Sequence, residues 1–315
     1  MAVGVPMTNF SETTDAASDS VKHVDAFNPK RRNRHAIAFM GALKEVVKRS
    51  ALETQLAWSS ATGSFPTVQM SSVKAITAFD DSHFLTGVEF IRSALLWAPG
   101  ANIHVWDLGL SPANREFLDR NSSVLSVIDF PFEDFPDFFS MTRPGGNMGW
   151  KPALLWQEAA DFRGHLIWMD AGNRLIGPID RLLWLAKGYG FYSPFSSGTV
   201  ADWTHPMTLQ GLGVPDPHLK RRNLHGAISV WDVGSTWARS LLNDWHRAAL
   251  SRDLLCPAGS DRSNHRRDQA LLTCLAYRRG YHAPRSLHYL NRGLRVVTHK
   301  DHDLPVGPIE ELIAP

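Results

Sequence analysis

Three short apolar stretches decide the fold of this 315-residue chain: VKAITAF at 73–79, IHVWDL at 103–108 and HLIWMD at 165–170. Each has the length and the apolar content of a buried strand. Between the first two lies FLTGVEFIRSALLW at 84–97, in which apolar residues recur at helical spacing. Strands that alternate with helices are typical of α/β proteins. We therefore predict an α/β fold with an open, mixed, mostly parallel sheet flanked by helices.

Weaker signals extend this pattern along the chain. Ser111 can cap a helix that starts at Pro112, because serine is a favoured N-cap and proline a favoured first helical residue. The remaining predicted elements are strands at 124–130, 190–193 and 227–231, and helices at 152–161, 236–250 and 268–278.

The domain organisation follows from changes in composition. Residues 1–34 are rich in Ser, Thr, Asp and Asn and lack periodicity, so we predict a disordered polar tail. Met40, Leu43 and Val47 recur at helical spacing, which predicts that residues 35–70 form a helix and a loop that pack on the main domain. The main domain then comprises residues 71–315.

Composition limits the classes of function. Lys and Arg number 33 against 31 Asp and Glu, and this small excess does not favour nucleic-acid binding. Two cysteines are too few for a disulfide scaffold or a cysteine zinc site. The sequence contains no apolar run of the ~20 residues needed to span a bilayer and no signal-peptide core, so we expect a cytoplasmic protein without a membrane span.

Acidic residues follow the predicted strands. Asp80 comes after the first strand, Asp107 closes the second, Asp129 lies in the third and Asp170 closes the fourth. A single Asp after a strand is most often a cap of the next turn. However, ligands of open α/β sheets bind where the carboxyl ends of the strands converge. Several carboxylates at one edge therefore indicate a candidate binding site.

The turn after the fourth strand offers two oxygen donors. Asp170 and Asn173 flank Ala171 and Gly172, and the glycine lets the backbone bend tightly. Oxygen donors of this kind suit Mg²⁺ or Mn²⁺, which can stabilise a leaving diphosphate as a Lewis acid. We predict Asp170 and Asn173 as candidate metal ligands.

Seven segments, in this order, carry a resemblance to a known family. They are TAFDDSHFLTGVEFIRSALLW at 77–97, VWDLGL at 105–110, FPFEDF at 130–135, GWKPALL at 149–155, IWMDAGNR at 167–174, HRAALSRDLLCPAG at 246–259 and HRRDQALL at 265–272. The set resembles an uncharacterised family related to nucleotide-diphospho-sugar transferases. The resemblance covers most of residues 73–280.

The resemblance implies a GT-A-like fold, with a Rossmann-like nucleotide-binding half, and a hexosyl- or related transferase activity. It implies Asp268 as the carboxylate at the reacting centre, with Asp202 as second choice. The nucleotide-sugar-binding residues that it implies are Thr77, Ala78, Phe79, Asp107, Lys151, Asp170, Ala171, Gly172, His225, Gly226 and Gln269.

The metal motif departs from the pattern of the family. The second carboxylate of a DxD motif is missing, and Asn173 falls three residues after Asp170. Two alternatives follow. Asn173 and a distant His299 complete a Mn²⁺ or Mg²⁺ site, or Lys151 and Arg174 neutralise the diphosphate without a metal.

The leading hypothesis is a glycosyltransferase that moves a sugar from a nucleotide-diphospho-sugar to an unidentified glycan, small molecule or peptide. The loop at 198–214 is where we expect the acceptor to bind. The alternative is a non-catalytic nucleotide-sugar-binding protein, which the missing carboxylate favours. A Rossmann dinucleotide enzyme is disfavoured, because no Gly-x-Gly-x-x-Gly follows the first strand.

Overall fold

The computed structural model describes residues 68–141, 147–282 and 294–298, together with scattered residues between 40 and 65. The chain divides into two compact units, Met1–Ser50 and Ala51–Pro315. In the first unit, Met40, Leu43 and Val47 are helical, as their spacing predicts. The tail predicted at 1–34 and the candidate ligand His299 lie outside the described residues. The predicted boundaries at residues 34 and 70 stay predictions.

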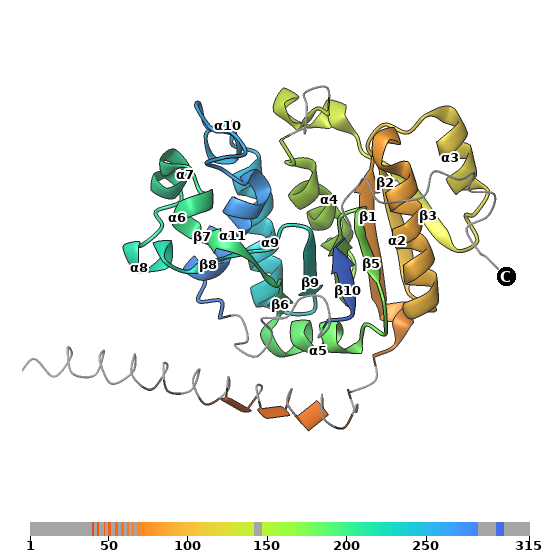
Figure 1. Ribbon diagram of the computed structural model, residues 1–315, viewed down its shortest axis with the longest axis horizontal. Helices are drawn as coiled ribbons and strands as arrows, with labels where there is room; N and C mark the ends of the chain where they lie inside the picture. The colour runs from red at the N-terminus through yellow and green to blue at the C-terminus, as the bar shows by residue number, and fades with distance from the viewer. Residues whose placement is uncertain are drawn as a thin grey trace, which may run out of the picture. The chain divides into compact units, whose positions relative to one another are not determined.

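A six-stranded sheet forms the centre of the second unit (Figure 1). Four strands pair in parallel, in the order β3-β2-β1-β4, and β9 and β6 continue the sheet with antiparallel pairings. The predicted open, mixed, mostly parallel sheet is thereby confirmed. The strands are β1 (Val73–Phe79), β2 (Asn102–Asp107), β3 (Leu125–Asp129), β4 (His165–Met169), β6 (Phe191–Tyr192) and β9 (Ile228–Asp232).

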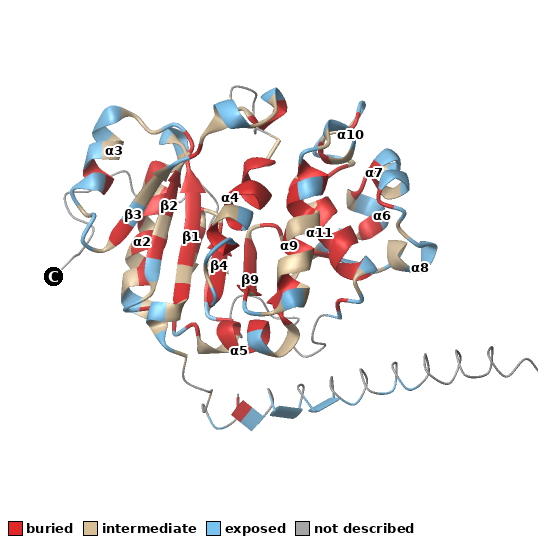
Figure 2. Cartoon of the chain, turned by 180° about the vertical axis from the view of Figure 1, so that it is seen from behind, coloured by how far each residue is buried: buried red, intermediate tan, exposed pale blue. Residues whose placement is uncertain are grey.

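Helices cover both faces of this sheet. The apolar core on one face includes residues of α2 and α5, and the core on the other face includes residues of α4, α9 and α11. Figure 2 shows β1, β4 and β9 buried between these layers. The helices are α2 (Phe84–Trp97), α3 (Pro112–Asp119), α4 (Trp150–Ala159), α5 (Asp180–Tyr189), α9 (Thr236–Ala249) and α11 (Arg267–Arg278).

Shorter elements complete the unit. The loop that we predicted at 198–214 contains the helices α6 (Val200–Trp203) and α7 (Pro206–Gly211). Two antiparallel pairs lie beside the sheet: β5 (Asn173–Leu175) with β10 (Val296–Thr298), and β7 (Phe195–Thr199) with β8 (Arg222–Leu224). The others are η1 (Met70–Ser72), η2 (Asp81–His83), η3 (Phe132–Asp134), η4 (Asp137–Phe139), α8 (Asp216–Leu219) and α10 (Arg252–Leu255). Among the described helices, none has the length and apolar content that crossing a bilayer requires.

Two local features stabilise the first part of the sheet, and the first of them was predicted from the sequence. The Ser111 hydroxyl accepts a hydrogen bond from the backbone amide of Asn114 at 3.4 Å, so it caps α3 as expected, with Pro112 as the first residue. Gly87 lies against the ring of Phe79, where an added Cβ would come within 2.3 Å of that ring. This close approach packs α2 onto the carboxyl end of β1.

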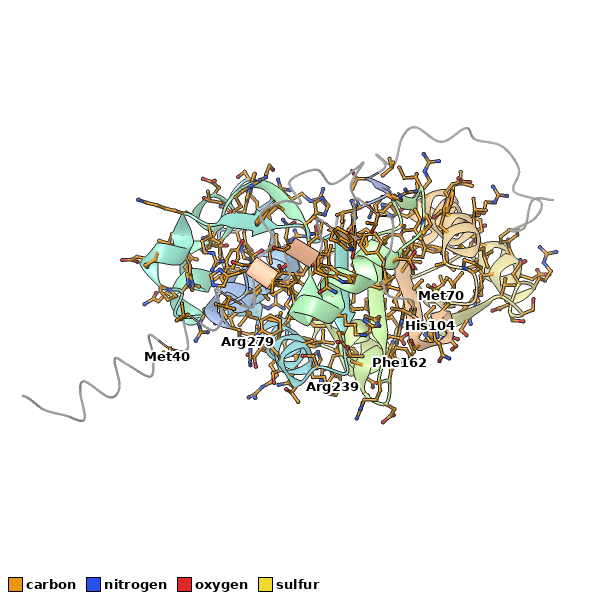
Figure 3. All side chains as sticks on the ribbon, turned by 90° about the horizontal axis from the view of Figure 1, so that it is seen from below. Met40, Met70, His104, Phe162, Arg239 and Arg279 are labelled. Carbon is orange, nitrogen blue, oxygen red and sulfur yellow. The ribbon has the colours of Figure 1, made fainter. Side chains whose placement is uncertain are left out.

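A buried ionic cluster stabilises the sheet on the side opposite to the carboxyl end of β1. Glu158 at the end of α4 accepts hydrogen bonds from Lys74 Nζ at 2.7 Å, His104 Nδ1 at 2.8 Å and Trp106 Nε1 at 2.9 Å. Burial raises the pKa of Glu158, but His104 and Lys74 outweigh it and lower the pKa overall. Arg239, labelled in Figure 3, donates to the backbone carbonyls of Ala159, the last residue of α4, and of Phe162. These contacts fix the position of α4, whose other end faces the site.

Candidate functional site

A cavity of about 350 Å³ opens at the carboxyl ends of the parallel strands. Ala78 and Phe79 at the end of β1 line one part of it, and the turn Asp170, Ala171 and Gly172 after β4 lines another. The chain order of the strands reverses between β1 and β4, because β2 and β3 extend from the other side of β1. A crevice at such a reversal is the place where open α/β sheets bind ligands.

The rest of the wall comes from segments that lie further along the sequence. Trp150 and Met148 stand at the start of α4, and His225 and Ala227 precede β9. Arg262 comes from the segment between α10 and α11. The antiparallel strand β9 therefore brings the C-terminal third of the chain to the ligand edge of the sheet.

Behind this wall, one lysine lies between two carboxylates. Lys151 Nζ is 2.8 Å from Asp170 Oδ1 and 3.5 Å from Asp268 Oδ2. It also donates a hydrogen bond to the carbonyl of Gly226 at 3.2 Å and lies 5.2 Å from the centre of the Trp168 ring. Lys151 is in the first turn of α4 and Asp268 is in the first turn of α11. The cluster thus joins the starts of two helices to the turn after β4.

The three charged groups differ in burial. The side chains of Lys151 and Asp268 are 4% and 6% exposed, whereas that of Asp170 is 41% exposed and lines the cavity. Burial, and then repulsion from Asp170, raise the pKa of Asp268 to about 6 against the pull of Lys151. Burial lowers the pKa of Lys151, but the two carboxylates outweigh it and raise the pKa overall. Lys151 therefore keeps its proton, and Asp268 is the acid in the cluster that ionises with difficulty.

The turn after β4 fits a divalent cation poorly. Asp170 Oδ1 already accepts from Lys151 Nζ and from Trp168 Nε1, both at 2.8 Å. The side-chain amide of Asn173 donates to the carbonyls of Asp170 at 3.0 Å and Ala227 at 3.1 Å. A metal at this turn would compete with an ammonium group for its one carboxylate, and no second carboxylate follows.

The structure bears on both alternatives given above for the diphosphate: a metal held by Asn173 and His299, or Lys151 and Arg174 without a metal. Within 68–141, 147–282 and 294–298, no group of three or more His, Cys, Asp or Glu side chains could hold a metal ion. Thr298, the neighbour of His299, pairs with Asn173 across β10 and β5 and lines the cavity. Arg174 instead points its guanidinium toward Glu89 of α2 at 3.7 Å. Arg174 is not among the residues of the cavity wall.

Six of the predicted nucleotide-sugar-binding residues line the cavity: Ala78, Phe79, Asp170, Ala171, Gly172 and His225. The candidate metal ligand Asn173 lines it as well. Thr77 does not, because it is fully buried within β1. His225 is half-buried, and burial lowers its pKa despite the nearby carboxylate of Asp170.

Two predicted carboxylates stabilise local structure away from the cavity. Asp107 accepts from the backbone amides of Gly109 and Leu110 and pairs with Arg115 at 3.1 Å. Asp202 forms a capping box with Thr199 at the start of α6 and is exposed. Neither lines the cavity wall. A role in ligand binding or catalysis stays a prediction for both residues.

Gly226 and Gln269 form a supporting layer behind the wall. The Gln269 side chain packs against Gly226, where an added Cβ would lie 2.9 Å from Gln269 Cβ. Gln269 Nε2 donates to the carbonyl of Leu224 at 2.7 Å. These two residues hold α11 against the segment before β9.

We did not predict Trp150, Trp168 and Arg262 as residues of the site. The two tryptophan rings lie 5.9 Å apart beside Lys151, and Trp168 donates to Asp170. Both tryptophans lie within segments quoted above, each within two residues of Lys151 or Asp170. This proximity in sequence could have identified them as neighbours of the site. Arg262 lies in a polar segment without periodicity or motif, and no feature of the sequence singles it out.

The chain is similar to several solved structures. The bifunctional glycosyltransferase WbbM matches 68% of this chain over 39% of its own, at 16% identity and a TM-score of 0.45. An active-site mutant of LgtC matches 75% of this chain over 88% of its own, at 16% identity and a TM-score of 0.47. Mouse xyloside xylosyltransferase 1 matches 67% over 83%, at 11% identity and a TM-score of 0.41. The chain thus spans less than half the length of WbbM.

No family model and no curated protein matches the sequence. The names of WbbM, LgtC and the mouse protein are those of glycosyltransferases.

Proposed function

We propose that the protein is a glycosyltransferase that moves a sugar from a nucleotide-diphospho-sugar donor to an unidentified acceptor. The observation that carries the proposal is the cluster of Lys151, Asp170 and Asp268 beside a cavity at the strand-order reversal. The cavity volume lies in the range of small-molecule sites, roughly 300–1,000 Å³. The site thus combines a ligand-sized space with charged groups held in fixed positions.

Glycosyl transfer breaks the bond between the sugar carbon C1 and a phosphate oxygen, and the bonding electrons leave with the diphosphate. The acceptor oxygen forms the new bond to C1, and its proton passes to a base. Negative charge therefore grows on the leaving diphosphate during the reaction. Lys151 lies behind Asp170, whose carboxylate faces the cavity, and its ammonium group offsets that negative charge beside the leaving diphosphate.

The burial of Asp268 changes the role that we assign to it. Its carboxylate is 6% exposed and contacts Lys151, whereas Asp170 is the carboxylate on the cavity wall. We therefore assign Asp268 as a positioning residue that holds Lys151, and Asp170 as the group that faces the ligand. Asp202 is a second candidate for a reacting carboxylate only if the acceptor reaches α6.

Release of nucleoside diphosphate from UDP-, GDP- and ADP-sugars tests the proposal. We expect slow release by the wild type and a loss on the order of 10² in rate for Lys151→Ala, in the range of a lost charge-stabilising donor. Lys74→Ala is the matched control, because Lys74 pairs with Glu158 at the opposite end of the sheet and should leave the rate unchanged. Circular dichroism of both variants is measured to check that they are folded.

A second candidate function is a non-catalytic nucleotide-sugar-binding protein. The missing second carboxylate after Asp170 favours it. Binding of a sugar nucleotide in calorimetry, without release of diphosphate in the presence of any acceptor extract, would support this candidate and contradict the transferase.

A further inference from the structure

The first compact unit, Met1–Ser50, presents an exposed apolar face on a helix. Met40, Leu43 and Val47 are helical, and they are 51%, 46% and 60% exposed, so no described part of this unit covers them. Residues three and four positions apart lie on the same face of an α-helix. The three side chains therefore form one surface, which we call the N-terminal apolar face. A row of large apolar side chains on a helix is typical of a surface that binds an apolar partner.

The sequence around the N-terminal apolar face is strongly basic. Residues 30–50 contain seven Lys and Arg residues but a single acidic residue, Glu45. The whole chain has 33 Lys and Arg against 31 Asp and Glu, so the rest of the chain is net acidic. The seven cations are Lys30, Arg31, Arg32, Arg34, Lys44, Lys48 and Arg49.

This charge indicates which partner covers the apolar face. A second copy of the same segment would bring two basic stretches together, and like charges repel. An anionic bilayer surface attracts the cations and also takes up the apolar side chains at the boundary between headgroups and acyl chains. Basic amphipathic helices are typical of proteins that bind to membrane surfaces. An anionic membrane surface is therefore the partner that satisfies both the apolar face and the charge.

We infer that the N-terminal apolar face binds the surface of an anionic membrane, with Met40, Leu43 and Val47 entering the headgroup boundary. The basic residues of 30–50 provide the attraction to the lipid phosphates. Each Lys or Arg close to such a surface raises the affinity about fivefold. This inference does not depend on the proposed function, because the residues that line the cavity all belong to the second unit, Ala51–Pro315.

Vesicle flotation with the full chain tests the inference. The probes are vesicles of phosphatidylcholine alone and of phosphatidylcholine mixed with an equal amount of phosphatidylglycerol. Salt is varied from about 0.1 M to about 1 M, which shortens the Debye length from ~10 Å to ~3 Å. We expect the wild type to float with the anionic vesicles at the lower salt. Binding to neutral vesicles, or at the higher salt, should be weaker by about tenfold or more.

Two variants separate the apolar contribution from the electrostatic one. Leu43→Glu/Val47→Glu places charge on the apolar face, and the lost burial of two side chains should weaken binding to anionic vesicles by about tenfold or more. Lys44→Gln/Lys48→Gln/Arg49→Gln keeps the apolar face and removes three cations. It should weaken binding by a factor on the order of 10², at about fivefold for each cation.

The matched control is Leu96→Glu/Ile176→Glu. It adds the same two negative charges at apolar residues of the second unit, which are 67% and 46% exposed. This variant should bind anionic vesicles like the wild type, within about threefold, because neither residue belongs to the N-terminal apolar face. Release of nucleoside diphosphate without vesicles should be the same in Leu43→Glu/Val47→Glu and in the wild type, so the inference and the proposed function can fail separately.

Three results would overturn the inference. The first is equal binding of the wild type to neutral and anionic vesicles, and the second is equal binding of the wild type and Leu43→Glu/Val47→Glu. The third is a wild type that does not float with any vesicle. If that wild type loses stability in urea on Leu43→Glu/Val47→Glu, the apolar face packs on the main domain. If it is instead a dimer in light scattering and the variant is a monomer, a second copy covers the face.

Discussion

At the scale of single residues, Lys151 is the group on which the site depends, and its loss should destabilise the protein. Lys151→Met leaves Asp268 buried without its cation, and breaking a buried pair from one side costs about 3–5 kcal/mol. The cost in this protein lies toward the lower end, because Asp268 can take up a proton, with a pKa already at about 6. Urea denaturation at pH 7 measures the free energy of unfolding.

The double variant Lys151→Met/Asp268→Leu identifies the cause of that loss. Removing the carboxylate as well should restore most of the stability, since neither buried charge remains. Lys220→Met is the control at an exposed lysine and should change stability by less than about 0.5 kcal/mol. A double variant as unstable as the single one would mean that lost packing, not charge, dominates.

Which site residues could be predicted depends on where they lie. Asp170 and Phe79 stand at strand ends, and the rule for open sheets places such positions at the ligand edge. The burial of Lys151 could not be read from its place at a helix start, because tertiary contacts with the turn after β4, the segment before β9 and α11 create it. Arg262 reaches the cavity from an irregular segment, where no periodicity fixes the direction of a side chain.

At the scale of elements, the close packing of Gly226 against α11 can be tested. Gly226→Ala places a Cβ at 2.9 Å from Gln269 Cβ, which has no freedom to move away from its helix. We expect a loss of about 1–3 kcal/mol, the usual cost of overpacking, measured by urea denaturation.

Gly211→Ala in α7 is the contrasting variant. Its added Cβ meets the terminal Cδ2 of Leu254 at 2.6 Å, and a flexible side-chain end can rotate aside. Alanine also favours a helix over glycine by about 1 kcal/mol, so the net change should be small. Equal losses of stability in Gly226→Ala and Gly211→Ala would mean that it does not matter whether the neighbouring atom is a fixed Cβ or a mobile side-chain end.

The long elements were predicted well, but the antiparallel direction of β9 was not. The helix predicted at 84–97 matches α2, and the helices predicted at 236–250 and 268–278 match α9 and α11 to within one residue at each end. Local periodicity decides helix or strand, but it carries no information on whether a strand runs parallel or antiparallel, so the reversal at β9 was not foreseen. The helices α6 and α7 are too short to show a period.

At the scale of the whole molecule, Asp268 should make stability depend on pH. Its pKa is 3.8 in an unstructured chain and about 6 in the folded protein, so between these values the folded state binds a proton that the unfolded state does not. Protonation then stabilises the fold, and this contribution is lost as the pH rises through 6. The wild type should therefore lose stability relative to Asp268→Asn, by up to about 3 kcal/mol, between pH 4 and pH 7.

Urea denaturation of both proteins at pH 4 and pH 7 measures this difference. The comparison with Asp268→Asn is needed because other carboxylates also make stability depend on pH. Their partners lower the pKa values of Glu158 and Asp80 despite burial, and the stability that these groups give is lost as the pH falls. These groups are common to both proteins and cancel in the difference. A difference that does not change with pH would mean that Asp268 titrates like an ordinary carboxylate.

The contact of Lys151 with the carbonyl of Gly226 joins residues that are 75 positions apart, and Asp268 follows later still. During synthesis the chain grows at ~5–20 residues per second from its N-terminus. The nascent protein therefore holds α4 and the turn after β4 for some seconds before α11 exists. In that interval Lys151 has Asp170 as its sole partner in the cluster, and the part of the cavity wall from His225 to Thr298 is made last. The wall is therefore complete only late in translation, once Thr298 has been added.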